Sequence, residues 1–127
     1  VMRRLEQQAG IDLDGLRLED VPGVAARIMA TIASHPREPR PELAPTLTAA
    51  GQREREALRH AVGTAAERWS ADQSAVAAAM LDVLLAVATY ERLAGDWELE
   101  PEQAIAGVTW VARLIATAVQ DDQGPLD

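Results

Sequence analysis

The side chains that could carry chemistry are few, and most are carboxylates. Asp12 and Asp14 have the spacing that opens a calcium-binding loop, but the sixth position of such a loop must be glycine and is Arg17 here. The two histidines, His35 and His60, lie on separate segments, and the chain has no cysteine. Thiolate catalysis and cysteine–zinc sites are therefore excluded, and we expect no metal site, no catalytic residue and no cofactor.

Motifs typical of enzymes are also missing from the sequence. It contains no glycine-rich phosphate loop, no G-x-S-x-G motif and no H-E-x-x-H motif. The Glu-x-x-His spacing of helical di-metal sites does not occur either. Glu98, Glu100 and Glu102 cluster near a predicted helix start, where a favourable interaction with the helix dipole explains them better than catalysis does. We therefore expect a protein that is not an enzyme.

Length and composition predict a single all-α domain. The chain has 127 residues, which is the size of one domain with one hydrophobic core. It contains 25 alanines, the best helix formers, and few alternating runs of β-branched or aromatic residues. The net charge of −8 argues against direct binding of a nucleic-acid backbone by these residues.

Helix start and stop signals divide the chain into five or six helices. Pro22 falls in the first turn of a helix that Asp20 can cap, and Pro101 opens the last helix. Ser70 and Gln73 match a capping box, in which each side chain bonds to the other residue's backbone N–H. The predicted helices cover residues 21–34, 52–69, 71–94 and 101–120, with a helix end at 1–9 and a short helix at 42–50. Four prolines between residues 36 and 45 form a stiff connector, and the acidic tail from residue 121 is expected to fray.

The last two long helices carry more apolar surface than a monomer needs. On a helical wheel, the large side chains of residues 75–93 form a predicted core face of Val76, Met80, Val83, Leu84 and Val87. The far side of this helix and one edge of the last helix are predicted to meet a second copy of the chain. These interface residues are Ala78, Leu81, Asp82, Leu85, Thr89, Gly107, Trp110 and Leu114. The resulting homodimer would contain an isologous four-helix bundle; the alternative is that Trp110 packs against the chain's own connector.

Apolar residues that point inward from the middle helices are candidates for a ligand pocket. They are Met29, Ile32, Leu58, Val62, Trp69, Met80, Leu84 and Val87. Met and Trp make an adaptable lining suited to a small apolar or aromatic ligand, and Trp69 and Met80 flank the helix corner at Ser70. The alternative is that these side chains simply fill the core. Asp82 could bind a ligand cation or pair across the dimer axis; the alternatives are an ion pair with an Arg of its own chain and simple exposure at the edge of the bundle.

Residues 90–104, YERLAGDWELEPEQA, continue into Val108-Thr109-Trp110. This segment resembles the link between the last two helices of TetR-type bacterial transcriptional regulators, and helix order and lengths fit the C-terminal regulatory domain of that family. The family's N-terminal helix-turn-helix does not occur in these 127 residues. The resemblance implies that the last two helices form a homodimer interface and that the earlier helices enclose a small-molecule pocket. It also implies that residues 1–9 end a helix leading to a DNA-binding head.

Two functions are therefore expected from the sequence. The first is a ligand-sensing and homodimerisation domain of a TetR-like regulator, in which DNA is bound only by a preceding domain and the ligand changes the spacing of the two DNA-reading heads. The second is a stand-alone helical dimerisation or adaptor module that binds no small molecule. No secretory signal or membrane span is evident, so a cytoplasmic protein without membrane contact is expected.

Overall fold

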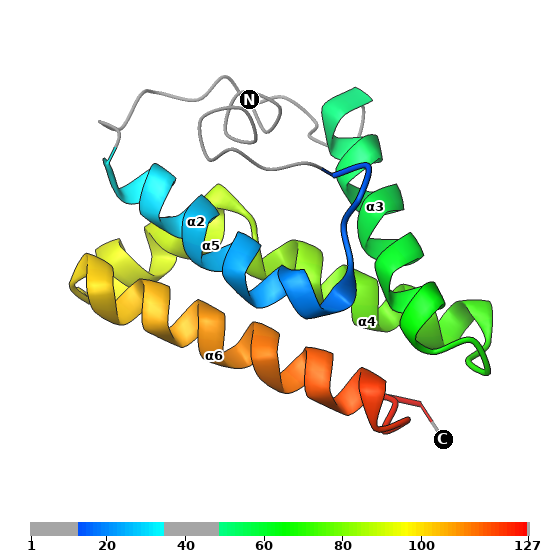
Figure 1. Cartoon of the computed structure of the whole chain (residues 1–127). Helices are drawn as coiled ribbons and strands as arrows, with labels where there is room; N and C mark the ends of the chain where they lie inside the picture. Colours follow the sequence, from blue (N-terminus) through cyan, green and yellow to red (C-terminus); the bar gives the residue numbers. More distant parts are fainter. Residues whose placement is uncertain (1–12, 35–48, 127) are drawn as a thin grey trace.

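A computed structural model describes residues 13–34 and 49–126 of the chain (Figure 1). Within these residues it contains five α-helices and no strand, which confirms the all-α class. The elements are the 3₁₀ turn η1 (Leu18–Asp20), α2 (Val21–Ser34), α3 (Ala49–Ala65), α4 (Ala71–Leu84), α5 (Val87–Glu91), the π-helical turn η3 (Arg92–Asp96) and α6 (Pro101–Gln120). The helix end expected at 1–9, His35, the four-proline connector and residues 42–48 of the short helix expected at 42–50 lie outside the described residues. The last two residues of that expected helix, 49 and 50, begin α3.

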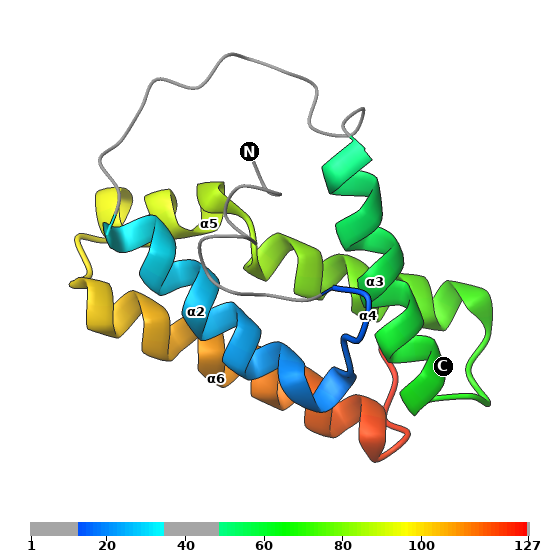
Figure 2. The ribbon, with the colours of Figure 1, turned by 45° about the horizontal axis from the view of Figure 1, so that its top comes forward.

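α2 and α6 lie side by side and run in opposite directions along most of their lengths (Figures 1 and 2). The contact face of α6 repeats every three or four residues and is mostly alanine: Ala104, Val108, Ala112, Ala116 and Val119 are buried. Alanine lets two helix axes approach closely, because little side chain separates the backbones. The facing stripe of α2 supplies the larger side chains, with Val21, Ile28 and Met29 fully buried.

α3 packs across α4 and closes the other side of the core (Figure 2). Leu58, Ala61 and Val62 of α3 are buried in one cluster with Leu81 and Leu85 from the α4 region. α3 ends at Ala65, four residues before the predicted end at Trp69, and a short turn leads to Ser70. His60 of α3 is exposed, whereas Leu58, Ala61 and Val62 of the same helix are buried.

The helix expected over residues 71–94 is broken, so this prediction was wrong. α4 ends at Leu84, Ala86 is extended (φ −75°, ψ 144°), and α5 starts a new helix at Val87. The two parts are bent by 53°. The hydroxyl of Thr89 donates to the Val83 carbonyl, which also accepts from the Ala86 N–H (3.3 Å). Tyr90 and Leu93, which follow the bend, pack against the core.

The described helices were also compared with the length and hydropathy of a membrane span. None of them alone is long and apolar enough to cross a bilayer. The bent pair Ala71–Leu84 and Val87–Asp96 meets the same length and composition limits when its two parts are taken together.

Candidate functional site

The face of α4 that was predicted to meet a second copy lies inside the chain. Ala78, Leu81 and Leu85 are buried in the core, Asp82 is half-buried, and Thr89 is half-buried and bonded to the Val83 carbonyl. The prediction that these residues form a dimer interface was therefore wrong: they belong to the core and its edge. The physical reason is that α4 is apolar on nearly every side, so its own sequence does not choose a face. The stripe of α3 packs on the Leu81 side and decides the orientation.

The opposite side of α4 is exposed and adjoins an exposed edge of α6. Met80 and Val83 of α4 are 52% and 56% exposed, and Trp110 and Leu114 of α6 are 61% and 51% exposed. Gly107 completes the α6 edge, and a Cβ atom there would meet nothing within 4 Å. Residues 80 and 83, like residues 107, 110 and 114, have the spacing of one helix face. We call these five residues the α4–α6 surface.

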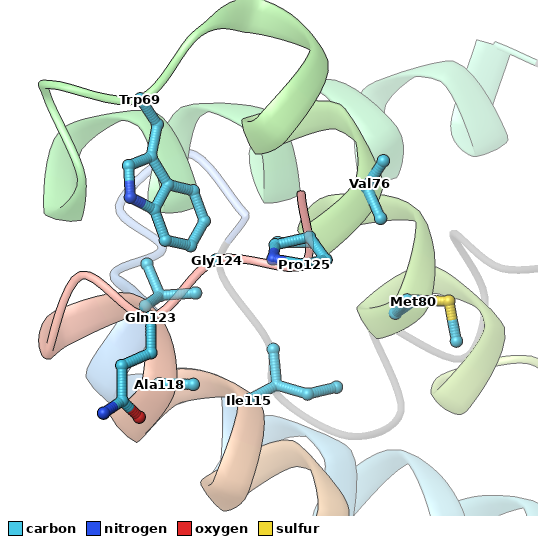
Figure 3. A pocket seen from close by; sticks show the side chains of 10 residues that line it. Trp69, Val76, Met80, Ile115, Ala118, Gln123, Gly124 and Pro125 are labelled. Atoms are coloured by element: carbon cyan, nitrogen blue, oxygen red, sulfur yellow. The ribbon is translucent and has the colours of Figure 1, made fainter. Parts of the chain in front are cut away.

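A pocket lies between α4, the end of α6 and the C-terminal segment (Figure 3). Its volume is about 190 Å³. Its walls are largely apolar, and none of the side chains that line it carries a charge. The lining residues are Trp69, Val76, Ala77, Met80, Ile115, Ala118, Val119, Gln123, Gly124 and Pro125. Met80 belongs both to this pocket and to the α4–α6 surface, so the two features share a side chain.

The C-terminal segment after α6 turns back toward α4, which differs from the expected frayed tail. Asp122 has a left-handed backbone (φ 59°). Its N–H donates to the Val119 carbonyl (3.1 Å), and the Gln123 N–H donates to the Ala118 carbonyl (2.8 Å). This pair of bonds is a Schellman motif, which ends the helix and reverses the chain, here with Asp in the position usually held by Gly.

Side chains at the start of α4 hold the reversed segment in place. The Trp69 Nε1–H donates to Asp122 Oδ1 (2.5 Å). The Gln73 carboxamide bonds twice to the backbone of Leu126: Nε2 donates to the carbonyl (2.9 Å), and Oε1 accepts from the N–H (2.7 Å). The tail is thus fixed by polar contacts to residues that lie 53 positions away in the sequence.

The predicted capping box at the start of α4 is only half formed. Ser70 Oγ accepts from the Gln73 N–H (3.2 Å), as expected. The Gln73 Oε1 that would return to the Ser70 N–H accepts from Leu126 instead. A reciprocal bond of this kind occurs at α6, where Gln103 Oε1 accepts from the Glu100 N–H (2.9 Å).

The predicted pocket residues fall into three groups. Trp69 and Met80 line the pocket described above. Met29, Leu58 and Val62 are fully buried in the core cluster, so the structure places them there and not in that pocket. The remaining three, Ile32, Leu84 and Val87, are half-buried, and the first two pack against the core.

Sequence reasoning missed the α6 and tail residues of the pocket. Ile115, Ala118 and Val119 belong to a predicted helix, but nothing local indicated that α4 diverges from it. A signal for the tail existed in residues 121–125, Asp-Asp-Gln-Gly-Pro, because Gly and Pro after a helix favour a defined turn. The partner of that turn, Gln73, had no such signal.

Carboxylates form no candidate reaction centre in the described part of the chain. No group of three or more His, Asp or Glu side chains there could hold a metal ion. The ion pairs Arg17–Glu19 (3.6 Å) and Arg92–Asp96 (3.7 Å) are on the surface, where such pairs contribute little.

Comparison with known proteins finds no relative. No protein-family model matches the chain, and neither a curated protein nor a solved structure gives a significant match.

Proposed function

We propose that the chain is a ligand-sensing homodimerisation domain of a bacterial transcriptional regulator of the TetR type. The observation that carries the proposal is the α4–α6 surface, where four large apolar side chains stand exposed on two adjoining helices. Large apolar side chains clustered on neighbouring helices favour a protein partner, and Trp is the residue type most enriched at the centre of interfaces.

A second copy of the chain is the partner that fits this surface best. α4 and α6 run in opposite directions (Figure 1), so the same two helices from a symmetry mate could pack on them as a four-helix bundle. Gly107 lies beside Trp110 and leaves room for a side chain from the other copy. In this arrangement the interface uses Met80 and Val83 of α4, and not the buried Leu81 side.

The regulatory role rests on the place of the pocket. It lies between the two helices of the proposed interface, and Met80 contributes to both. A ligand that alters the spacing of α4 and α6 would bind the two dimer geometries with different affinity, which is the requirement for allosteric control. DNA binding would belong to a separate helix-turn-helix domain.

A helical adaptor without a small-molecule role is the second candidate. The full burial of Met29, Leu58 and Val62 favours it, because these side chains fill the place where a central pocket was expected. Both candidate functions require the same homodimer. They differ in whether a small ligand changes the stability of that dimer.

The test is the oligomeric state of Trp110→Glu, measured by sedimentation velocity over a range of concentrations. A glutamate at the centre of an apolar interface must be desolvated, so we expect at least about a hundredfold increase in the dimer Kd. Trp97→Glu is the matched control, since Trp97 is 70% exposed but lies outside the α4–α6 surface. A wild-type chain that sediments as a 13.7 kDa species at high concentration, or a Trp110→Glu dimer of unchanged Kd, would contradict the proposal.

A further inference from the structure

The C-terminal segment 121–126, which we call the strap, is one wall of the pocket as well as the end of the described chain. Gln123, Gly124 and Pro125 line the cavity opposite Val76 and Met80 of α4 (Figure 3). Removing the strap would therefore remove three of the ten residues that line the pocket and widen its opening to solvent.

The contacts that hold the strap are few and lie at the surface. They are the Trp69–Asp122 hydrogen bond and the two bonds between Gln73 and the Leu126 backbone. Each involves groups that can bond to water instead, so each contributes little net free energy. The Schellman turn is made by main-chain bonds of Asp122 and Gln123 to α6, so the backbone can pivot there while the Asp122 carboxylate leaves Trp69.

Gly124 shows how closely the strap and Gln73 fit. A Cβ atom at this position would lie 2.2 Å from Gln73 Nε2 and 2.6 Å from its Cδ. The Gln73 carboxamide would have to move, and it cannot do so while it keeps both bonds to Leu126. Alanine at this position would therefore displace the flexible Gln73 side chain and cost the strap these two bonds, while the Trp69–Asp122 bond is not in the way.

We propose that the strap is a hinged lid on the α4–α6 pocket and that the ligand of this pocket is a small uncharged molecule with one aromatic ring. This inference rests on the proposed ligand-sensing role and deepens it. An apolar protein cavity of about 150 Å³ accommodates benzene, so a single ring fits the 190 Å³ here. The lining offers no charged side chain, and the nearby Asp122 carboxylate together with the net charge of −8 disfavours an anion.

The strap covers one side of an apolar pocket that is otherwise partly open to solvent, so release of the strap would widen the entrance for a ligand. Trp69 and Pro125 stand at the strap side of the cavity, whereas Ile115 and Ala118 of α6 form its floor (Figure 3). The ligand enters while the strap is swung out, and the association rate is then proportional to the fraction of open molecules.

The experiment is an NMR titration of the full chain with toluene. The Met80 and Ile115 methyl signals report on the pocket, and the Trp69 indole N–H signal reports on the strap. In the wild type we expect saturable shifts at both methyl groups. In Gly124→Ala and in Gln73→Ala, the Trp69 signal should move toward that of a solvated indole. The toluene association rate should rise about tenfold, given an open state populated at about 10% or less in the wild type.

Gly63→Ala is the matched control, because the same methyl group added to α3 meets nothing within 4 Å. It should leave both the Trp69 signal and the association rate unchanged. Equal rates in the wild type, Gly124→Ala and Gln73→Ala would overturn the lid. The absence of methyl shifts in every variant would overturn the ligand class.

These experiments test the lid and the proposed ligand-sensing dimer independently of each other. The strap lies within one copy of the chain, so the titration can be repeated in Trp110→Glu. A monomeric wild type would contradict the proposed dimer and leave the strap result intact. A dimer whose Kd is unchanged by saturating toluene would contradict the sensing role, even with the lid confirmed.

Discussion

α6 meets its two neighbouring helices in different ways, although alanine lines both contacts. On the α2 side, Ala112 and Ala116 are buried against a helix that follows α6 along most of its length. On the α4 side, Ala77 and Ala118 line a hollow of about 190 Å³. α4 is shorter than α6 and ends at Leu84, where the chain bends by 53° into α5, so α4 contacts α6 over a smaller part of its length than α2 does. Small residues thus give close helix packing only where the neighbouring helix runs alongside α6. On the α4 side, residues 123–125 fill part of the space between the helices.

The largest expected effect distinguishes the two sides of α4. Leu81→Ala removes a fully buried side chain and should lower the free energy of unfolding by about 2–5 kcal/mol in a urea titration. Met80→Ala, one residue earlier, changes a side chain that is 52% exposed and should lower it by less than about 1 kcal/mol. Equal losses of unfolding free energy in the two variants would contradict the orientation of α4, in which Leu81 is buried and Met80 is exposed.

Replacing an alanine of α6 by leucine should change stability by different amounts on its α2 side and its α4 side. Ala112→Leu adds volume to the close α2 contact, where overpacking should destabilise the chain by about 1–3 kcal/mol. Ala118→Leu places the same atoms at the pocket and should change stability by less than about 1 kcal/mol. Thermal unfolding of both variants measures the difference, and an equally large loss for Ala118→Leu would argue against a hollow there.

A smaller effect is expected at the bend between α4 and α5. Thr89→Val keeps the shape of the side chain but loses the hydroxyl that donates to the Val83 carbonyl, which should lower stability by about 1 kcal/mol. Thr89→Ser keeps the donor and serves as the control. If urea unfolding finds Thr89→Val as stable as the wild type, the hydroxyl does not stabilise the bend.

The smallest effect concerns the glycine of the α4–α6 surface. Gly107→Ala should stabilise a monomer by about 0.5–1 kcal/mol, because alanine is the better helix former and a Cβ atom there meets nothing. We expect this gain in the Trp110→Glu background. In the wild type, close packing of a second copy at Gly107 should cancel it. An equal gain in both backgrounds, measured by thermal unfolding, would place Gly107 outside the interface.

The sequence was sufficient for the helices whose ends carry local signals. Pro22 and Pro101 mark the starts of α2 and α6, and the predicted ranges 21–34 and 101–120 agree with the structure. The break after Leu84 could not be predicted, because neither Gly nor Pro lies there and Leu85-Ala86 favours helix. The core face of α4 was assigned to the wrong side because Met80 and Leu81 are equally apolar and only α3 decides between them.

The candidate site was predicted less completely than the fold. Trp69 and Met80 were named from their position at the helix corner, and both line the pocket. Gln73 was assigned a local role at the helix start, and the structure gives its side chain a partner 53 residues away. Local motifs describe which bonds a side chain can make, whereas the folded chain decides which of them it makes.

The half-formed capping box gives the strap an unusual energetic property. While the strap is closed, Gln73 Oε1 accepts from Leu126; once it leaves, the same oxygen can accept from the Ser70 N–H and complete the box. One hydrogen bond is exchanged for another instead of being lost to water. The exchange offsets one of the three hydrogen bonds that hold the strap, and α4 gains order at its first turn as the tail loses it. Slower amide exchange at Ser70 would then accompany release of the strap.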